Sequence, residues 1–377
     1  MKILVTGAKG FVGKNLIWEL RNRDYTDIME YDINSTEEEL DQYTKDCDFV
    51  FHLAGVNRPK IEEEFMEGNF GFTSELLAHL DKWGNQAPIL ITSSIQAELD
   101  NAYGKSKRAG EELLFAHQEM TGAKSLVYRL QNVFGKWCRP NYNSGIATFC
   151  HNIAHGLDIC VNDPNVMMNL VYIDDVVDEF IAALNGNENR IGKYCMIPTV
   201  HTASLGKIVE MIMGFRESRT NLSVPNMGNE LEKKLYSTYL SYLPHDQFSY
   251  ELDMKKDERG SFTEFLRTKD RGQVSVNISN PGVTKGKHWH HTKNEKFLVV
   301  SGEGSVRFRQ IDSDEIIEYH VSGEKLEVID IPTGYTHDIS NEGTSPMVTI
   351  MWANEAFDPE KPDTYFMPVT EDAEDCK

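Results

Sequence analysis

Three side chains between residues 94 and 107 could together move a proton at a carbonyl group. Tyr103 and Lys107 are four residues apart in a helix-forming stretch, so they share one face of that helix. A phenol has a pKa of about 10 and is a weak acid at neutral pH, but a neighbouring ammonium stabilises the phenolate. Ser94 ends the preceding apolar run, and its hydroxyl can hold a substrate carbonyl beside the phenol. The spacing predicts general acid–base chemistry at a carbonyl.

A glycine-rich turn near the N-terminus has the form of a dinucleotide site. Gly7, Gly10 and Gly13 follow a short apolar run and open a stretch of helical periodicity. Glycines there permit a tight turn and let a pyrophosphate approach the N-terminus of the helix. The alternative is a strand–helix corner that merely needs a positive φ. The order of strand, glycines and helix favours the nucleotide site.

Two residues bear on the choice of cofactor. Asp32 ends the second apolar run, about 20 residues after the turn, where an acid binds the ribose hydroxyls of NAD. Lys9 lies inside the turn and could instead meet the 2′-phosphate of NADP. The sequence predicts NADP(H) or NAD(H) and leaves the choice between them open.

Histidines and a glutamate in the C-terminal part have the spacing of a metal site. His288 and His290 are alternate residues, which share one face of a strand, and Glu295 and His337 follow on later segments. Neighbouring strands of a small barrel would bring these four side chains inward together. Imidazole and carboxylate ligands suit Zn²⁺ among the divalent transition metals. Four protein ligands also fit a purely structural zinc, because a catalytic zinc usually keeps an open position.

The residues of the carbonyl and dinucleotide sites and those of the metal site lie in segments that predict two different folds. Over residues 1–243, apolar runs alternate with stretches of helical periodicity, which predicts a Rossmann-like, doubly wound parallel sheet. Residues 125–135 are predicted as one strand of that sheet. Short β-branched and aromatic segments separated by turns predict an all-β sandwich or barrel over residues 244–369. The acidic segment 370–377 lacks periodicity and is predicted to be disordered.

The amino-acid composition of the chain argues against some classes of binding partner. The 377 residues contain 38 Lys and Arg against 59 Asp and Glu, a formal net charge of −21. A chain of that sign is repelled by phosphate backbones, so nucleic-acid binding is not expected. No apolar run approaches the roughly 20 residues of a membrane helix, and the N-terminus is not expected to be a signal peptide. The six cysteines lack Cys-x-x-Cys spacing and fit reduced thiols in a cytoplasmic protein.

The N-terminal motifs together resemble the extended short-chain dehydrogenases/reductases that act on nucleotide sugars. The resemblance covers about residues 1–243 and includes the segments 52–55, 132–135 and 171–176 together with Asn69. It implies that the catalytic residues are Ser94, Tyr103 and Lys107. It implies that the cofactor is bound by Gly7, Lys9, Gly10, Phe11, Val12, Gly13, Asp32, Leu53, Ala54, Tyr103 and Lys107. It implies that the substrate is contacted by Arg58, Asn132 and Arg139.

The C-terminal spacing resembles the two motifs of the cupins, which are jelly-roll barrels. The intervals from Gly282 through the ligand candidates to Gly302 match the first motif. His337 falls in the second motif, where Leu326 replaces an expected glycine. The same region also resembles metal-free deoxysugar 3,5-epimerases, in which the residue matching His288 is a base. His288 is therefore either a ligand or a base, and the presence of the other three ligand candidates favours a ligand.

A reductase joined to an epimerase-like cupin resembles the bifunctional CapF-type enzymes of capsular polysaccharide synthesis. The resemblance implies that the cupin epimerises C3 of a UDP-4-keto-6-deoxy-N-acetylhexosamine. The reductase then reduces the C4 ketone to give UDP-2-acetamido-2,6-dideoxy-L-talose. The C3 proton is acidic only while the C4 carbonyl can delocalise the carbanion, so epimerisation must come first. Candidates for the proton carrier of the epimerase are His291, Lys296, Tyr319 and Tyr335.

Two other functions stay open at this point. One is a nucleotide-sugar 4-ketoreductase whose cupin only binds sugar or holds a dimer together. The other is a non-enzymatic dinucleotide sensor, against which the presence of Ser94, Tyr103 and Lys107 counts. Exchange of the C3 proton with solvent separates the first from a bifunctional enzyme, and turnover excludes the second. By analogy with cupins and reductases, a homodimer is expected.

Overall fold

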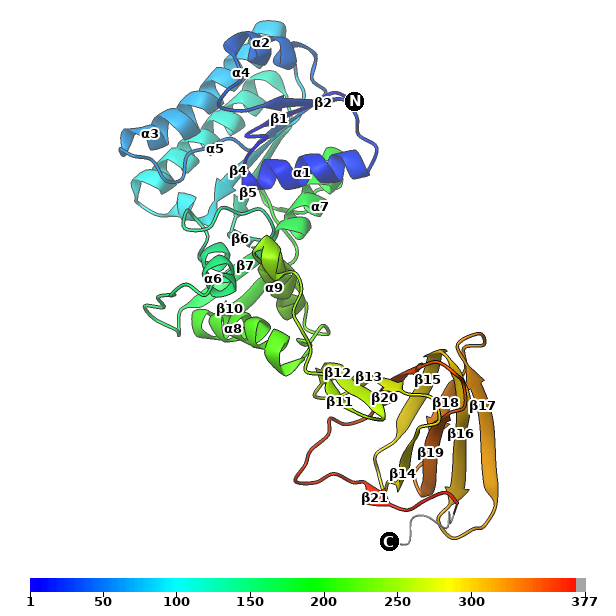
Figure 1. The fold of residues 1–377 in the computed structure, drawn as a ribbon. Coiled ribbons are helices and arrows are strands. Elements are labelled where there is room, and N and C mark those ends of the chain that lie inside the picture. The colour runs from blue at the N-terminus through cyan, green and yellow to red at the C-terminus, as the bar shows by residue number, and fades with distance from the viewer. Residues whose placement is uncertain (371–377) are drawn as a thin grey trace. The chain divides into compact units, whose positions relative to one another are not determined.

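The computed structural model describes residues 1–370, which fall into two compact units (Figure 1). The first unit comprises Met1–Met213 and Gly228–His245, and the second comprises Gly214–Met227 and the chain from Asp246 onward. The segment Gly214–Met227 joins the β-rich unit through the backbone of Arg267, whose amide donates to Leu222 and whose carbonyl accepts from Val224. Sequence periodicity alone assigned this segment to the helical part. The boundary between a reductase domain and a cupin domain at residue 244 stays a prediction.

The first unit is built on a seven-stranded sheet in the order β2-β1-β3-β4-β5-β9-β8. Its parallel strands are β1 (Ile3–Thr6), β2 (Ile28–Tyr31), β3 (Phe49–His52), β4 (Ile89–Ser94), β5 (Ser125–Leu130) and β9 (Tyr194–Cys195). The edge strand β8 (Arg190–Ile191) is antiparallel. The strand order reverses between β1 and β3, which is where open α/β sheets bind their ligands. The predicted Rossmann-like sheet is confirmed.

Helices cover both faces of this sheet (Figure 1). One apolar layer packs between the sheet and α1 and α7, and another packs between the sheet and α2, α4 and α5. A π-helical turn, Met66–Gly71, precedes α4. The helices are α1 (Phe11–Asn22), α2 (Glu37–Asp46), α3 (Glu63–Phe65), α4 (Phe72–Trp83), α5 (Ala102–Thr121), α6 (Gly145–Ala154), α7 (Ile173–Leu184), α8 (Leu205–Asn221) and α9 (Glu230–Leu240).

The single strand predicted over residues 125–135 is two strands that belong to different sheets. Leu130 pairs with Ser94 at the end of the main sheet. Asn132 pairs instead with Leu170, in a three-stranded sheet of the order β10-β7-β6. The strands of that sheet are β6 (Asn132–Phe134), β7 (Met167–Tyr172) and β10 (His201–Ser204). The chain changes sheets at Gln131, and the sequence carries no Gly or Pro there to mark the change.

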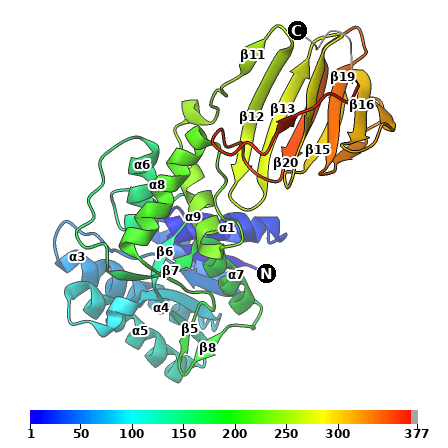
Figure 2. The ribbon, with the colours of Figure 1, turned by 90° about the horizontal axis from the view of Figure 1, so that it is seen from below.

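The second unit consists mainly of two antiparallel sheets (Figure 2). Their orders are β11-β12-β13-β20-β15-β18 and β17-β16-β19-β14-β21. They enclose an apolar core that includes Phe297, Val306, Phe308 and Ile339. The predicted all-β fold is confirmed. The strands are β11 (Lys255–Asp257), β12 (Gly260–Thr268), β13 (Gly272–Ser279), β14 (Thr284–Trp289), β15 (Glu295–Ser301), β16 (Glu303–Gln310), β17 (Ile316–Ser322), β18 (Val328–Ile331), β19 (Tyr335–Asn341), β20 (Met347–Ala353) and β21 (Tyr365–Phe366).

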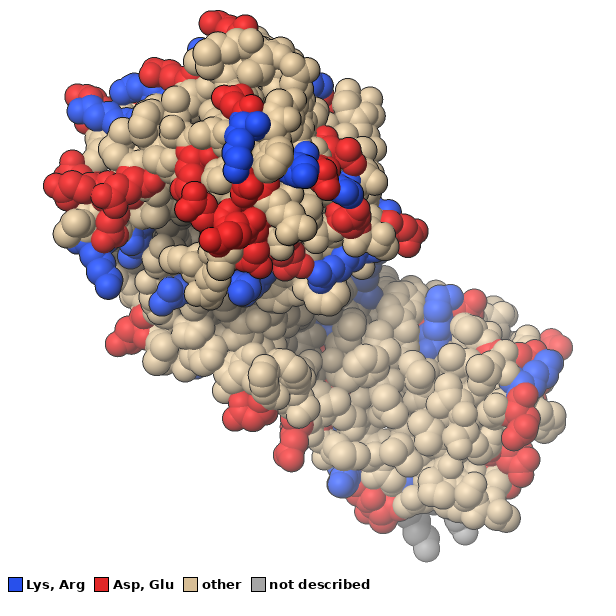
Figure 3. Space-filling view, turned by 90° about the horizontal axis from the view of Figure 1, so that it is seen from above, with Lys and Arg blue, Asp and Glu red and all other residues tan. Residues whose placement is uncertain are grey.

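The surface reflects the acidic composition. Figure 3 shows acidic side chains in clusters over the face of the first unit that it presents, with basic side chains among them. Among residues 1–370, no helix combines the length and apolarity needed to cross a membrane. The segment predicted to be disordered, 370–377, lies outside the described residues except for Thr370.

Candidate active site and metal cluster

The glycine-rich turn packs too tightly for any other residue at two of its positions. Gly7 has a φ of 69°, in the left-handed region that favours glycine. A Cβ atom on Gly7 would lie 2.7 Å from the amide nitrogen of Ala54, and one on Gly13 would lie 2.3 Å from the carbonyl oxygen of Gly7. Gly10 caps α1 without a side chain, so the first amides of the helix remain for a ligand.

Asp32 lies directly after β2 and is held beside this turn. Its Oδ2 accepts a hydrogen bond from the amide of Lys9 at 2.7 Å, and its Oδ1 accepts one from the amide of Ile33 at 2.9 Å. The carboxylate is therefore fixed by the backbone of the turn itself. Lys9 lines the adjoining cavity, whereas Asp32 and Ala54 lie outside its lining.

The three predicted catalytic side chains line the same cavity as the glycine-rich turn. This cavity has a volume of about 600 Å³. The strand β4 ends at Ser94, and α5 carries Tyr103 and Lys107 one turn apart. Asn101 caps α5, where its Oδ1 accepts from the amide of Gly104 at 2.7 Å. The predicted cofactor residues that line the cavity are Gly7, Lys9, Gly10, Phe11, Val12, Gly13, Leu53, Tyr103 and Lys107.

Contacts within this group suit proton donation by the phenol. The hydroxyl of Ser94 is hydrogen-bonded to Tyr103, and the Nζ atom of Lys107 lies 6.0 Å from the centre of the Tyr103 ring. Lys107 also donates to the carbonyl of Thr92 at 3.1 Å. Burial raises the pKa of Tyr103, so the phenol stays protonated at neutral pH. Burial lowers the pKa of Lys107 to about 8, against the opposing charge of Glu111.

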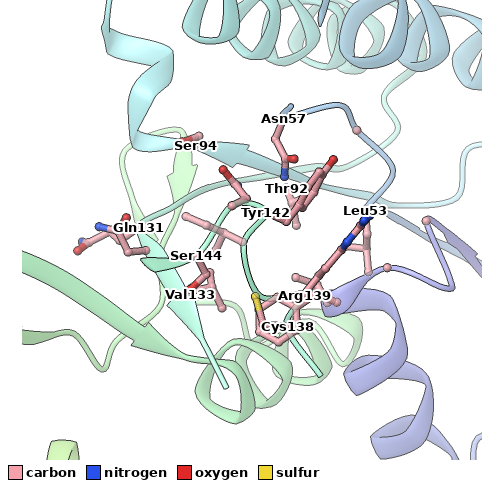
Figure 4. A pocket seen from close by; sticks show the side chains of 18 of the residues that line it. Leu53, Asn57, Thr92, Ser94, Gln131, Val133, Cys138, Arg139, Tyr142 and Ser144 are labelled. Atoms are coloured by element: carbon pink, nitrogen blue, oxygen red, sulfur yellow. The ribbon is translucent and has the colours of Figure 1, made fainter. Parts of the chain in front are cut away.

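The predicted substrate residues divide into two groups. Asn132 and Arg139 line the cavity, whereas Arg58 is exposed and lies outside the lining. The guanidinium carbon of Arg139 is 5.2 Å from the centre of the Tyr142 ring. Figure 4 shows Ser94 on one wall of the cavity and Arg139 and Tyr142 on another.

Two amide side chains that the sequence analysis did not single out also face the cavity. Asn57 and Gln131 both line it, and the side-chain oxygen of each is buried without a partner among the described residues (Figure 4). A buried oxygen in that state can accept a hydrogen bond from a ligand. Gln131 stands where the chain passes from β5 to β6, a position that sequence periodicity did not mark.

The four predicted metal ligands converge inside the β-rich unit. All their ligand atoms lie within 4.8 Å of one another. His288 on β14 and His337 on β19 are directly opposite in register, while Glu295 begins β15 in the other sheet. The Oε2 atom of Glu295 lies 3.7 Å from Nε2 of His290 and 3.4 Å from Nε2 of His337. Both sheets therefore contribute to the cluster.

The donor set fits a divalent cation. His290 and His337 are each 1% exposed, and the Nε2 atoms of both have no hydrogen-bond partner among the described residues. Such unpartnered buried atoms cost about 1–3 kcal/mol each, which a bound cation would offset. Burial alone would raise the pKa of Glu295, but the two imidazoles and Lys293 hold it well below its usual range. A carboxylate with three imidazoles is a common ligand set for transition metals.

Known proteins resemble this chain over its whole length. Residues 3–194 match the NAD dependent epimerase/dehydratase family, and residues 255–365 match the polysaccharide biosynthesis C-terminal domain. A UDP-2-acetamido-2,6-beta-L-arabino-hexul-4-ose reductase of Pseudomonas aeruginosa is 47% identical over 373 residues, which are 99% of this chain and 100% of that protein. The crystal structure of the capsular polysaccharide assembling protein CapF from Staphylococcus aureus is 54% identical, with a TM-score of 0.93 over 98% of this chain and 100% of that one. The chain belongs to the CapF-type family.

A second CapF-type structure contains an inhibitor. CapF solved with 3-isopropenyl-tropolone is 50% identical to this chain, with a TM-score of 0.89 over 98% of this chain and 100% of that one. The agreement in fold extends over both units, so the arrangement of elements within each unit is that of the CapF-type family.

In this CapF-type chain a residue that the sequence analysis missed holds the loop beside the candidate metal ligands. The carboxylate of Asp363 accepts hydrogen bonds from the amides of His291, Thr292 and Lys293 at 2.9–3.0 Å. Its backbone carbonyl accepts from Nδ1 of His290 at 2.6 Å. These bonds hold the loop between two ligands, and they lower the pKa of Asp363 against the effect of burial. Asp363 lies 73 positions after His290, so no pattern of residue spacing pointed to it.

The candidate proton carriers differ in their surroundings. His291 is exposed beside Trp289, Lys296 forms an ion pair with Asp330, and Tyr319 is half exposed. Tyr335 packs against the apolar core. Another residue, Lys293, places its ammonium 3.2 Å from Oε1 of Glu295 and is largely buried. The sequence analysis did not single it out; it lies two residues before Glu295, in the loop that precedes β15.

Proposed function

We propose that this chain is a bifunctional UDP-sugar enzyme. The β-rich unit inverts C3 of a UDP-4-keto-6-deoxy-N-acetylhexosamine, and the first unit then reduces the C4 ketone to give UDP-2-acetamido-2,6-dideoxy-L-talose, a precursor of capsular polysaccharide. The observation that carries the proposal is that Ser94, Tyr103 and Lys107 share one cavity with the glycine-rich turn. The relative from Pseudomonas aeruginosa is named as a reductase of a UDP-4-keto sugar, which supports the same substrate class here.

In the reduction, each residue of the cavity has a separate task. A bound reduced nicotinamide supplies the hydride to C4 of the sugar. Ser94 holds the C4 oxygen by a hydrogen bond, and Tyr103 gives its phenolic proton to that oxygen as the alcohol forms. Lys107 stabilises the phenolate that remains. NADP(H) or NAD(H) would serve, and a homodimer stays a prediction.

In the epimerisation, the four-residue cluster of His288, His290, Glu295 and His337 would hold Zn²⁺ or another divalent transition metal. A bound cation would supply positive charge that stabilises the enolate while a base takes the C3 proton and a proton is returned to the opposite face of the sugar. Tropolone carries adjacent carbonyl and hydroxyl oxygens, a pair that chelates such cations, so the inhibitor in the CapF structure is consistent with this assignment. The protein residues fix the cluster and exclude water from two of its imidazoles.

The two activities can be separated in one experiment. The 4-keto substrate is incubated in deuterated water with NADPH, and NMR follows deuterium at C3 while absorbance follows NADPH oxidation. Tyr103→Phe should slow oxidation by at least about 100-fold and leave deuterium exchange intact. His337→Ala should abolish exchange and leave the reduction of pre-epimerised substrate intact. Tyr25→Phe, whose hydroxyl bonds Asn185 outside the cavity, is the control.

The outcome also separates the competing functions. Loss of exchange in Tyr103→Phe would contradict the assignment of the two steps to two units. Wild-type protein that reduces the ketone without any exchange would be a single-activity 4-ketoreductase whose cupin is not catalytic. Protein that binds the dinucleotide without turnover would be a sensor.

A further inference from the structure

A buried carboxylate continues the face of α5 that carries the predicted catalytic residues. Tyr103, Lys107 and Glu111 follow one another at intervals of four residues, so they lie along one face of the helix. Glu111 is 1% exposed, and its carboxylate accepts hydrogen bonds from Nε and Nη2 of Arg129 at 2.9 and 2.6 Å. Removing two charges from water is costly, and apolar residues can often replace a buried ion pair without loss of stability. Stability alone therefore does not account for this pair.

The carboxylate of Glu111 also binds the strand that carries Ser94. Its Oε1 atom accepts a hydrogen bond from the hydroxyl of Ser93, the residue before Ser94 on β4, which is 5% exposed. Ser93 lies opposite Arg129 in the pairing of β4 with β5. The hydroxyl of Tyr194 on β9 donates to Oε2 of Glu111 at 3.3 Å and accepts from Nη2 of Arg129 at 2.7 Å. One carboxylate thus joins α5 to three neighbouring strands of the sheet.

Arg129 also binds the segment that follows Ser94. Its Nη1 atom donates to Oε1 of Glu98 at 3.0 Å. Glu98 ends the 3₁₀ turn Ile95–Glu98, which begins directly after Ser94. The network therefore contacts the chain on both sides of Ser94, at the residue before it and at the turn after it. A serine held in this way keeps its hydroxyl beside the phenol of Tyr103, to which it is hydrogen-bonded.

The charge of Glu111 acts on the ammonium of Lys107. Burial lowers the pKa of Lys107 to about 8, and the negative charge of Glu111 opposes that effect. Two other titratable groups lie near this ammonium, the phenol of Tyr103 on the same helix and the imidazole of His52 on β3. Burial keeps both of these groups neutral at pH 7. Glu111 therefore provides negative charge that keeps the ammonium protonated.

We propose that Glu111 is a positioning residue for the reduction of the ketone. Its carboxylate fastens the end of β4, which carries Ser94, to the face of α5 that carries Tyr103 and Lys107, and it places a negative charge one helical turn from the ammonium. Glu111 and Arg129 both lie outside the lining of the cavity, so they act through other residues and not on the substrate itself. This inference rests on the proposed reductase function and extends it to a group behind the cavity wall.

The first test measures the titration of Lys107 directly in the full-length protein. Lysines are labelled with ¹³C at Cε, and the NMR signal of Lys107 is identified by its loss in Lys107→Met. Glu111→Gln should lower the pH midpoint of this signal by about 1–2 units, and Glu111→Asp, which keeps the charge, should restore most of the shift. Glu112→Gln, at an exposed position of the same helix, should leave the midpoint unchanged. An unchanged midpoint in Glu111→Gln would overturn the inference.

The second test removes the bond between Glu111 and β4 without removing a charge. Ser93→Ala should slow single-turnover hydride transfer at saturating substrate by about 3- to 10-fold, with the KM for the sugar and the Lys107 midpoint unchanged. Ser74→Ala, at an exposed position of α4, is the control. Wild-type hydride transfer in Ser93→Ala would refute the positioning role. Because this variant keeps the buried ion pair, it tests the inference even where Glu111→Gln does not fold.

Failure of the proposed function would give a different result. A wild-type protein that reduces no UDP-4-keto sugar would contradict the reductase function. A lowered Lys107 midpoint in Glu111→Gln of that same protein would still support the assigned action of Glu111 on Lys107, because the NMR titration needs no turnover.

Discussion

The backbone carbonyl of Asp363 accepts a hydrogen bond from Nδ1 of His290 at 2.6 Å. A carbonyl oxygen can only accept, so Nδ1 carries a proton, and Nε2, which lies 3.7 Å from Oε2 of Glu295, is the ring nitrogen left to bind a cation. An imidazole fixed in this tautomer by a neighbouring carbonyl is the usual form of a histidine ligand. The bond therefore prepares His290 to bind a cation.

Replacing Asp363 with alanine should weaken metal binding by about 10- to 100-fold. The variant loses the carboxylate that holds three backbone amides of the ligand loop, so the loop and the carbonyl partner of His290 both become less ordered. Competition with a chromophoric chelator measures the affinity. Asp312→Ala, at an exposed position in the same unit, is the control and should bind metal as the wild type does. Equal affinity in the two variants would show that Asp363 has no part in the site.

The reduction should slow as the pH rises above about 8. Burial lowers the pKa of Lys107 to about 8, so the ammonium that stabilises the Tyr103 phenolate is lost above that pH. Single-turnover hydride transfer at saturating substrate should fall by about tenfold per pH unit in this range. Lys107→Met should be slow at every pH and should lack the break. Lys105→Met removes an exposed lysine of the same helix that pairs with Asp100, and it should keep the break.

Acid should destabilise the first unit through His52. This imidazole is buried between the hydroxyls of Thr6 and Thr73, at 2.8 and 2.9 Å, and burial lowers its pKa to about 3. Between pH 6.5 and 3 the unfolded chain binds this proton and the folded chain does not, so the free energy of unfolding falls as the pH falls.

Proton binding by His52 in the unfolded chain lowers the free energy of unfolding by up to about 1.4 kcal/mol for each pH unit. Denaturant unfolding from pH 7 to 5 should give a smaller slope for His52→Gln than for wild type. His155→Gln, an exposed histidine of the same unit, should retain the wild-type slope. Identical slopes in all three proteins would mean that His52 does not titrate in this way.

Two glycine substitutions should have opposite effects. A Cβ atom at position 13 would lie 2.3 Å from a backbone oxygen, so Gly13→Ala should lower the free energy of unfolding by about 1–3 kcal/mol and weaken cofactor binding. Gly214 lies within α8 with no atom within 4 Å of the added Cβ, so Gly214→Ala should stabilise by about 0.5–1 kcal/mol. Thermal unfolding and NADPH titration measure both. A Gly13→Ala protein that binds NADPH as the wild type does would refute the packing argument.

Features that depend on neighbours in the chain could be predicted from the sequence. The turn from Gly7 to Gly13 and the helix that carries Tyr103 and Lys107 each depend on residues close together in the sequence. The pair His288 and His290 was also predicted from its spacing, although β14 ends at Trp289. The two fold classes followed from the periodicity of the apolar residues. The sheet change at Gln131 did not, because it depends on which distant strand pairs with Asn132.

Tertiary structure alone decided the features that join distant segments. Asp363 accepts a hydrogen bond from His290, and Lys293 lies beside Glu295. Both Asp363 and Lys293 lie in loops, whose paths cannot be predicted from the periodicity of nearby residues. On β19, Ile339 lies opposite Lys285 and His337 lies opposite His288, and the extra residue Lys287 forms a bulge that brings both side chains to one face. The pairing of β14 with β19 creates this bulge, so the sequence of residues 284–289 does not predict it. Side-chain direction along a strand is local, but the partner across the sheet is chosen by the whole fold.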